Sequence, residues 1–172
     1  MRWIVFILLL CLILTVQSAV IPRLSLWGAR ADLLLATTVF LGLFARPRES
    51  IVAAWLLGVG ADLLTIERFG LMSLTYVVIA LSVSSIRLYV FRESRLTQLV
   101  VTLIAALLVN LFGLLYRHVV YDPGESVVRG LGGSVILASL YTTAMSMPLY
   151  AVLRRLGPAL GLPRRHSAAV SF

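Results

Sequence analysis

The stretch LLLATTVFLGLFARPRESIVAAWLLGVGADLLTIERFG, residues 33–70, contains two long apolar runs separated by one short basic break. The first run ends at the segment RPRES, residues 46–50, and the second continues to Ile66. A bilayer core about 30 Å thick is crossed by about 20 helical residues, so each run is close to the length of one membrane span. Because the break is short, the two helices must pack antiparallel. The stretch therefore predicts a helical hairpin within a membrane.

The rest of the chain repeats this pattern. Of the 172 residues, 60% are hydrophobic and 13% are charged, whereas a soluble domain has about 45–50% apolar and about 25% charged residues. Pro, Gly and acidic residues interrupt the apolar runs at each break. We expect an all-α integral membrane protein with six transmembrane helices in one domain, residues 1–156, and a cytoplasmic tail, residues 157–172. The predicted spans are residues 3–21, 27–45, 51–66, 69–91, 96–116 and 131–153.

The distribution of arginines predicts the orientation of the spans, because cytoplasmic loops carry an excess of basic residues. With the N-terminus in the cytoplasm, ten arginines lie inside and five outside. The inside set is Arg2, Arg46, Arg48, Arg87, Arg92, Arg95, Arg154, Arg155, Arg164 and Arg165; the outside set is Arg23, Arg30, Arg68, Arg117 and Arg129. Both termini are therefore predicted to be cytoplasmic. A cleaved signal peptide ending near VQS is the alternative for the first run, but that run continues to Ile21.

Asp62 is the most informative polar residue, because carboxylates within membrane spans usually face the interior of the bundle or a cavity. It lies near the predicted outer end of the third span, and the start of the second span brings Arg30 and Asp32 to the same level. Glu67 and Arg68 follow in the next turn. An ionised Asp62 requires Arg30, an N–H donor or interfacial water as a partner. Three interpretations stay open: a structural tie or partner surface, a simple interfacial residue, and a ligand or ion contact.

Small residues surround Asp62 at helical spacing. Ala54, Gly58 and Asp62 are four residues apart, so they share one helix face and allow a neighbouring backbone to approach closely. Gly70 follows the segment ERF and is expected to end the turn before the fourth span. The simpler explanation is that glycine is frequent in membrane helices in general.

Two further residues mark the last spans. Asn110 lies near the middle of the fifth span, where an unpaired amide is costly, so we expect it to hydrogen-bond between helices. Pro148 lies in the sixth span and should kink or break the helix, because proline lacks the N–H that bonds four residues back.

The sequence contains no constellation typical of an enzyme. Both histidines, His118 and His166, lie outside the predicted spans, and the single cysteine, Cys11, has no partner for a metal site. No second acid shares the span of Asp62, and no glycine-rich loop precedes a basic residue to bind phosphate. The arginines fall between apolar runs, which argues against nucleic-acid binding. We therefore predict no catalytic, cofactor-binding or metal-binding residues and no cofactor.

Residues 27–92 carry a resemblance to a known family. The basic turn RPRES, the pattern Gly58-x-x-x-Asp62-Leu63-Leu64 and the following Gly70 resemble the rod shape-determining protein MreD family. Farther along, MPLYAVLRRLG is similar to the closing proline helix and basic residues of that family, at Pro148, Arg154 and Arg155. The segment RAD at residues 30–32 departs from the usual proline start of the second span.

The resemblance implies a non-enzymatic inner-membrane scaffold of the bacterial elongation complex, which maintains cell shape. Its implied partners are a single-span MreC-like protein, a RodA-type glycosyltransferase with its penicillin-binding transpeptidase, membrane lipid and, indirectly, MreB. In this setting Arg30, Asp32, Gly58, Asp62, Gly70, Asn110 and Pro148 are candidates for structural or partner contacts.

The family also resembles, in fold, the six-helix substrate-binding subunits of energy-coupling vitamin transporters. The alternative function is therefore a membrane subunit that binds a small vitamin in an outward-facing pocket over Asp62 and Asn110. A neighbouring MreC-like coding sequence would favour the scaffold, and neighbouring transporter ATPases would favour the transporter.

Overall fold

The computed structural model describes residues 2–19, 21–24, 30–64, 70–86, 94–120 and 135–161. Within these ranges every regular element is helical, as the composition predicts. The described residues form six α-helices, and a short 3-10 helix, Ile21–Leu24, follows the first of them. The α-helices are α1 (Trp3–Ala19), α2 (Leu33–Phe44), α3 (Pro47–Leu64), α4 (Leu71–Ile86), α5 (Arg95–Val120) and α7 (Ile136–Leu160).

Each of the six predicted apolar runs overlaps one α-helix, but the helices differ in length from the predicted spans. By length and composition, Arg95–Tyr116 and Ile136–Leu160 are long and apolar enough to cross a membrane, while α1, α2 and α4 are apolar but shorter. α2 is short because both of its ends are fixed. Asp32 caps its start, and Ala45 leaves the helical conformation immediately after Phe44. Pro47 then takes the first position of α3, where its missing N–H would have no helical partner.

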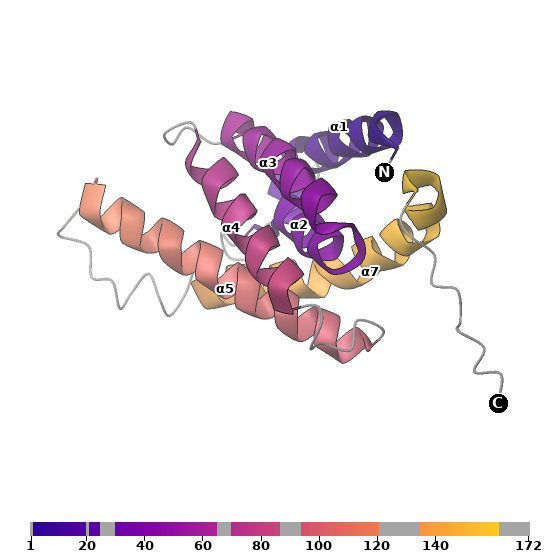
Figure 1. Ribbon diagram of the computed structural model, residues 1–172. Helices are drawn as coiled ribbons and strands as arrows, with labels where there is room; N and C mark the ends of the chain where they lie inside the picture. Colours follow the sequence, from indigo (N-terminus) through magenta and orange to yellow (C-terminus); the bar gives the residue numbers. More distant parts are fainter. Residues whose placement is uncertain are drawn as a thin grey trace.

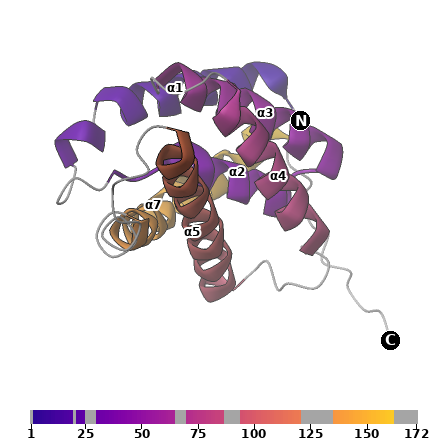
Figure 2. The same ribbon diagram turned by 90° about the vertical axis from the view of Figure 1, so that its left-hand side faces the viewer.

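α2 is the centre of the bundle. All of its residues from Leu33 to Leu43 are buried, and it contacts α1, α3, α4, α5 and α7. Figures 1 and 2 both show α2 between α1 and α3 on one side and α5 and α7 on the other. A helix that is hydrophobic on every face is expected to be buried among others. This helix is therefore the core onto which the longer helices pack.

α5 and α7 form an antiparallel pair on one side of α2 (Figure 1). The Tyr150 hydroxyl lies 2.6 Å from Thr102 Oγ1, and Asn110 Nδ2 donates to Ser139 Oγ at 3.1 Å. As residue numbers rise along α5, those of the partners on α7 fall. The start of α5 therefore lies beside the end of α7.

The described ends of the chain meet at this same end of the bundle. The backbone N–H of Arg2 donates to the Leu160 carbonyl at 2.9 Å. α7 continues to Leu160, inside the predicted tail, and ends at Gly161, which adopts the left-handed conformation with φ 69°. Glycine takes this conformation without a steric penalty, so it is the common residue at a helix C-terminus.

Pro148 does not break α7, contrary to one of the two expected outcomes. The helix is continuous from Ile136 to Leu160 with both Pro148 and Pro158 inside it. Proline removes only one backbone hydrogen bond, and the packing of a long helix on its neighbours is enough to keep it continuous. The Pro148 side chain is exposed.

Candidate functional site

Asp62 lies at the contact between α3 and α4 and is only 3% exposed. Its Oδ1 accepts the backbone N–H of Met72 at 2.9 Å, and its Oδ2 accepts those of Gly70 at 3.0 Å and Ser73 at 3.1 Å. The Ser73 hydroxyl also donates to Oδ2, at 2.5 Å. One carboxylate on α3 therefore binds the first turn of α4 through four hydrogen bonds.

The start of α4 needs such an acceptor. The first N–H groups of a helix have no partner within the helix, and a Ser, Thr, Asp or Asn side chain just before it usually accepts them. Here the residue at that position is Gly70, whose carbonyl accepts from Leu74 N but which has no side chain. Asp62, which lies on α3, therefore caps α4 in place of a side chain at position 70. Its negative charge also faces the positive end of the α4 dipole.

The conformation of Gly70 explains why no ordinary capping residue stands there. Its φ is 102°, in the region that residues with a side chain rarely adopt. This conformation aims the Gly70 N–H at Asp62 Oδ2. The predicted turn-ending glycine and the predicted polar residue thus form parts of one junction.

Gly58 allows α3 and α4 to approach closely enough for these hydrogen bonds. A Cβ at this position would lie 2.4 Å from Ser73 Cα and 2.9 Å from Ser73 N. These are backbone atoms, so no side-chain rotation could relieve the contact. Gly58 lies one turn before Asp62 on α3, and both face the first turn of α4. Close approach, which the four-residue spacing predicts, is therefore found at Gly58.

Asp32 forms a second polar cluster beside the first. Its Oδ1 caps α2 by accepting Leu35 N at 2.9 Å, and its Oδ2 accepts the hydroxyl of buried Tyr76. The backbone N–H of Asp32 donates to Thr142 Oγ1 at 3.0 Å. Tyr76 lies one turn after Ser73 on α4, so the clusters of Asp32 and Asp62 are adjacent.

Gln17 of α1 completes this polar layer. Its amide nitrogen, Nε2, donates to the Ala31 carbonyl at 2.9 Å, and its Oε1 accepts the Leu33 N–H at 3.1 Å. Together with the bonds of Asp32 and Asp62, these contacts connect α1, α2, α3, α4 and α7. We call this set the polar layer: Gln17, Asp32, Asp62, Ser73, Tyr76 and Thr142.

Arg30 is exposed and forms no ion pair with Asp32 or Asp62, both of which lie in the described part of the chain. Of the partners considered for Asp62, the N–H donors are the ones that the geometry provides. Glu67 and Arg68, which the sequence brings to the same level, lie outside the described residues. Several N–H donors stabilise the charged form of a carboxylate.

Asn110 connects α5 and α7, as expected of an interhelical amide. Its Nδ2 donates to the Ala106 carbonyl at 2.9 Å on its own helix and to Ser139 Oγ at 3.1 Å on α7. Ser139 in turn donates to the Val135 carbonyl at 2.7 Å. Neither Asn110 nor Pro148 belongs to the polar layer.

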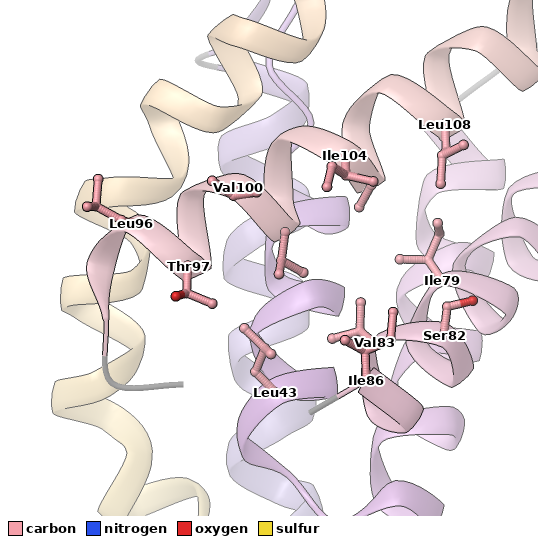
Figure 3. Close-up of a pocket in the computed structure, with 12 residues that line it drawn as sticks. Leu43, Ile79, Ser82, Val83, Ile86, Leu96, Thr97, Val100, Ile104 and Leu108 are labelled. Carbon is pink, nitrogen blue, oxygen red and sulfur yellow. The ribbon is translucent and has the colours of Figure 1, made fainter. Parts of the chain in front are cut away.

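Two cavities accompany these contacts. The larger, of about 470 Å³, lies between α4 and α5, and apart from Ser82 and Thr97 its lining is aliphatic or alanine. Figure 3 shows Ile79, Val83 and Ile86 facing Val100 and Ile104 across it. The smaller, of about 300 Å³, lies between α5 and α7 and is lined by polar and apolar groups. Neither cavity is lined by Asp62 or Asn110, where the vitamin-pocket hypothesis expects one.

The described residues also contain no group of three His, Cys, Asp or Glu side chains that could hold a metal ion. Asp32 and Asp62 belong to separate hydrogen-bonded clusters, each of which includes a helix start. The arrangement can fix helices relative to one another.

Several members of the polar layer were not singled out by the sequence, namely Gln17, Ser73 and Tyr76. Each carries a polar group within an apolar run, which is the signal that could have identified them. The acceptor that each one uses lies outside its own helix, 14 residues away for Gln17, 11 for Ser73 and 44 for Tyr76. Such pairs cannot be derived from spacing along one helix.

Comparison with known protein families gives one match. The family model described as rod shape-determining protein MreD matches residues 1–156, nearly the whole chain, including every residue of the polar layer. No match is found among curated proteins or among solved structures. The chain belongs to the rod shape-determining protein MreD family.

Proposed function

We propose that this protein is a non-enzymatic scaffold of the elongation complex in the bacterial inner membrane. Membership of the MreD family implies a role in determining rod shape. The scaffold would hold a single-span MreC-like protein and, with it, a RodA-type glycosyltransferase and a penicillin-binding transpeptidase, with MreB acting indirectly. A rigid helical bundle would serve this role by presenting a fixed surface to its partners.

The observation that carries the proposal is how the carboxylates of Asp32 and Asp62 are used. Asp62 caps α4 and Asp32 caps α2 while accepting the Tyr76 hydroxyl. Acids used in this way stabilise the bundle, and neither acid lines the two cavities between α4 and α5 and between α5 and α7. The polar layer therefore supports a structural role for both residues, and its effect on a partner would be indirect.

We also propose that the chain is multi-pass with both termini in the cytoplasm. The Arg2–Leu160 hydrogen bond joins the two ends of the described chain, and an even number of spans would put both ends on one side of a membrane. Reporter fusions after Arg48, Arg92 and Arg165 should report a cytoplasmic position, and fusions after Arg23 and Gly124 an external one. An external reporter after Arg165 would contradict the six-span topology.

The functional test is co-purification with an MreC-like partner combined with complementation of rod shape. Cells that lack the protein should regain rod shape when the wild-type chain is expressed, and the partner should be retained on the purified protein. Asp62→Leu should reduce both the recovery of rod shape and the amount of partner retained, because it removes the acceptor that caps the start of α4. The matched control is Arg30→Gln, which changes an exposed residue at the start of the second predicted span.

The same experiment separates the scaffold from the transporter alternative. Failure of the wild-type chain to bind the partner and restore shape, together with restored vitamin uptake in a transport-deficient strain, would contradict the scaffold function. Restored shape without any effect on uptake would support it.

A further inference from the structure

The smaller cavity, of about 300 Å³, has the composition of a site for an anionic headgroup. It is lined by Arg95, Gln98 and Leu99 of α5 and by Met147, Tyr150 and Arg154 of α7, together with Ala151. Because α5 and α7 are antiparallel, the first residue of α5 lies at the same level as the last turns of α7. Two guanidinium groups from different helices therefore border one cavity.

The charge of these two arginines is not neutralised within the described residues. Neither Arg95 nor Arg154 forms an ion pair there, and both side chains are exposed. The Arg154 guanidinium lies 5.8 Å from the centroid of the Phe44 ring. That cation–π contact does not neutralise the charge of Arg154. Arg95 also stands at the positive end of the α5 dipole.

The remaining lining determines which kind of anion fits. Leu99, Met147 and Ala151 form an apolar border, and Met147 is 56% exposed. Met147 and Arg154 are seven residues apart on α7, or about 10 Å along the helix axis. A ligand that contacts both the arginines and Met147 needs a negative group at one end and an apolar part about 10 Å away. A phospholipid has this form, whereas a small soluble anion has no apolar part.

We propose that this cavity binds the phosphate group of an anionic phospholipid, with Arg95 and Arg154 as its ligands. The guanidiniums donate to the phosphate oxygens, and the glycerol and first methylene groups lie against Leu99 and Met147. Basic pockets between membrane helices are known to bind anionic headgroups in this way. The lipid would hold the start of α5 against the end of α7.

The test compares two pairs of substitutions with the same change in net charge. Arg95→Gln with Arg154→Gln removes both proposed ligands. Arg48→Gln with Arg155→Gln removes two exposed arginines at the same end of the bundle that do not line the cavity. Each purified protein in detergent is titrated with phosphatidylglycerol or phosphatidylcholine in mixed micelles while thermal unfolding is followed. Glycerol 3-phosphate and inorganic phosphate are titrated in separate experiments with the same readout.

Phosphatidylglycerol should stabilise the wild-type protein at lower concentrations than phosphatidylcholine. The Arg95/Arg154 pair should weaken this effect roughly 25-fold, since each basic residue near a membrane surface contributes about fivefold. The Arg48/Arg155 pair should stay within about twofold of the wild type. Equal weakening in both pairs, or no preference for phosphatidylglycerol in the wild type, would overturn the proposal. Equal stabilisation by glycerol 3-phosphate or inorganic phosphate would assign the cavity to a soluble anion instead.

Ala151→Glu provides a second variant that retains both arginines. Ala151 is exposed and lines the cavity, so a glutamate there places a carboxylate beside the guanidiniums without burying it. This variant should lose the phosphatidylglycerol effect while melting at the wild-type temperature without lipid. Retention of the full lipid effect in Ala151→Glu would contradict the site even if the double arginine variant failed to fold.

Discussion

The α3–α4 contact and the α5–α7 contact both rely on polar residues within apolar helices, but they differ in chemistry. At α3–α4, a carboxylate binds backbone N–H groups, and Gly58 brings the two backbones together. At α5–α7, neutral side chains meet one another, as in the Asn110–Ser139 and Thr102–Tyr150 pairs. The first contact joins a side chain mainly to the main chain, with the Ser73 hydroxyl as one further donor, and the second joins side chain to side chain.

This difference decides how each contact responds to substitution. A backbone N–H cannot be removed by substitution, and the N–H groups of Met72 and Ser73 are held in direction by the helix, so the loss of Asp62 leaves them without an acceptor. When a neutral pair loses one partner, the other can turn to a carbonyl on its own helix, as Ser139 already does at Val135. We therefore expect the α3–α4 contact to be sensitive to substitution and the α5–α7 contact to be tolerant.

The largest effect is expected from Asp62→Leu. It removes the acceptor of three backbone N–H groups, of which that of Ser73 is buried and those of Gly70 and Met72 are part-buried, and a hydrogen bond to a charged group contributes about 1.5–3 kcal/mol. The loss of stability should therefore be at least about 3 kcal/mol. Asp62→Asn keeps one carbonyl oxygen and should lose less. Thermal unfolding in detergent measures both variants, and equal melting of Asp62→Leu and the wild type would contradict the capping role.

Gly58→Ala should have the next largest effect. The new Cβ would lie 2.4 Å from Ser73 Cα, so the helices must separate, and overpacking of this kind costs about 1–3 kcal/mol. Gly113→Ala is the matched control, because a Cβ at Gly113 has no atom within 4 Å. That control should be neutral or slightly stabilising, since alanine favours helix by up to about 1 kcal/mol over glycine. Equal destabilisation by both substitutions would contradict close approach at Gly58.

Gly70→Ala tests the turn that precedes α4. At φ 102° an alanine is strained, and left-handed backbone costs a residue with a side chain roughly 1–2 kcal/mol. The Gly70 N–H would also turn away from Asp62 if the backbone relaxed. Combining Gly70→Ala with Asp62→Leu should therefore cost less than the sum of the two. Strict additivity in the melting data would indicate that Gly70 acts independently of Asp62.

The smallest effect is expected from Asn110→Leu. One interhelical hydrogen bond is lost, which is worth about 0.6–2 kcal/mol in membrane helices. Cell shape should be retained, because Thr102 and Tyr150 still connect the same two helices. Unchanged melting with loss of rod shape would show instead that Asn110 acts in function and not in packing.

The sequence predicted the helical class, the six apolar runs and the family because these depend on composition and local pattern. It also identified Gly58, Asp62 and Gly70, whose spacing along the chain reflects one local junction. Gly70 at a turn, Gly58 at helical spacing from Asp62, and a carboxylate within an apolar run are each recognisable in the sequence. Their assembly around the first turn of α4 is short-range in sequence, since Asp62 and Ser73 are 11 residues apart.

The partners of Asp32 could not be predicted in the same way. Tyr76 is 44 residues away and Thr142 is 110 residues away, so their contacts depend on how α4 and α7 pack around α2. Opposite charge predicts an Arg30–Asp62 pair. Backbone N–H groups are present at every residue except proline, so the sequence does not show which of them contact Asp62. The helices α5 and α7 extend past the C-terminal ends of the apolar runs at residues 96–116 and 131–153, because a helix can continue after the apolar segment has ended.

A double-mutant cycle between Asp62 and Ser73 tests the central claim most directly. Asp62→Ala, Ser73→Ala and the double variant are unfolded in detergent, with Arg30→Gln replacing Ser73→Ala in a control cycle. Residues in one hydrogen-bonded cluster couple by about 0.5–3 kcal/mol, so the Asp62–Ser73 cycle should show coupling in this range. The Asp62–Arg30 cycle should be additive within about 0.5 kcal/mol. Additivity between Asp62 and Ser73, with coupling between Asp62 and Arg30, would contradict the account.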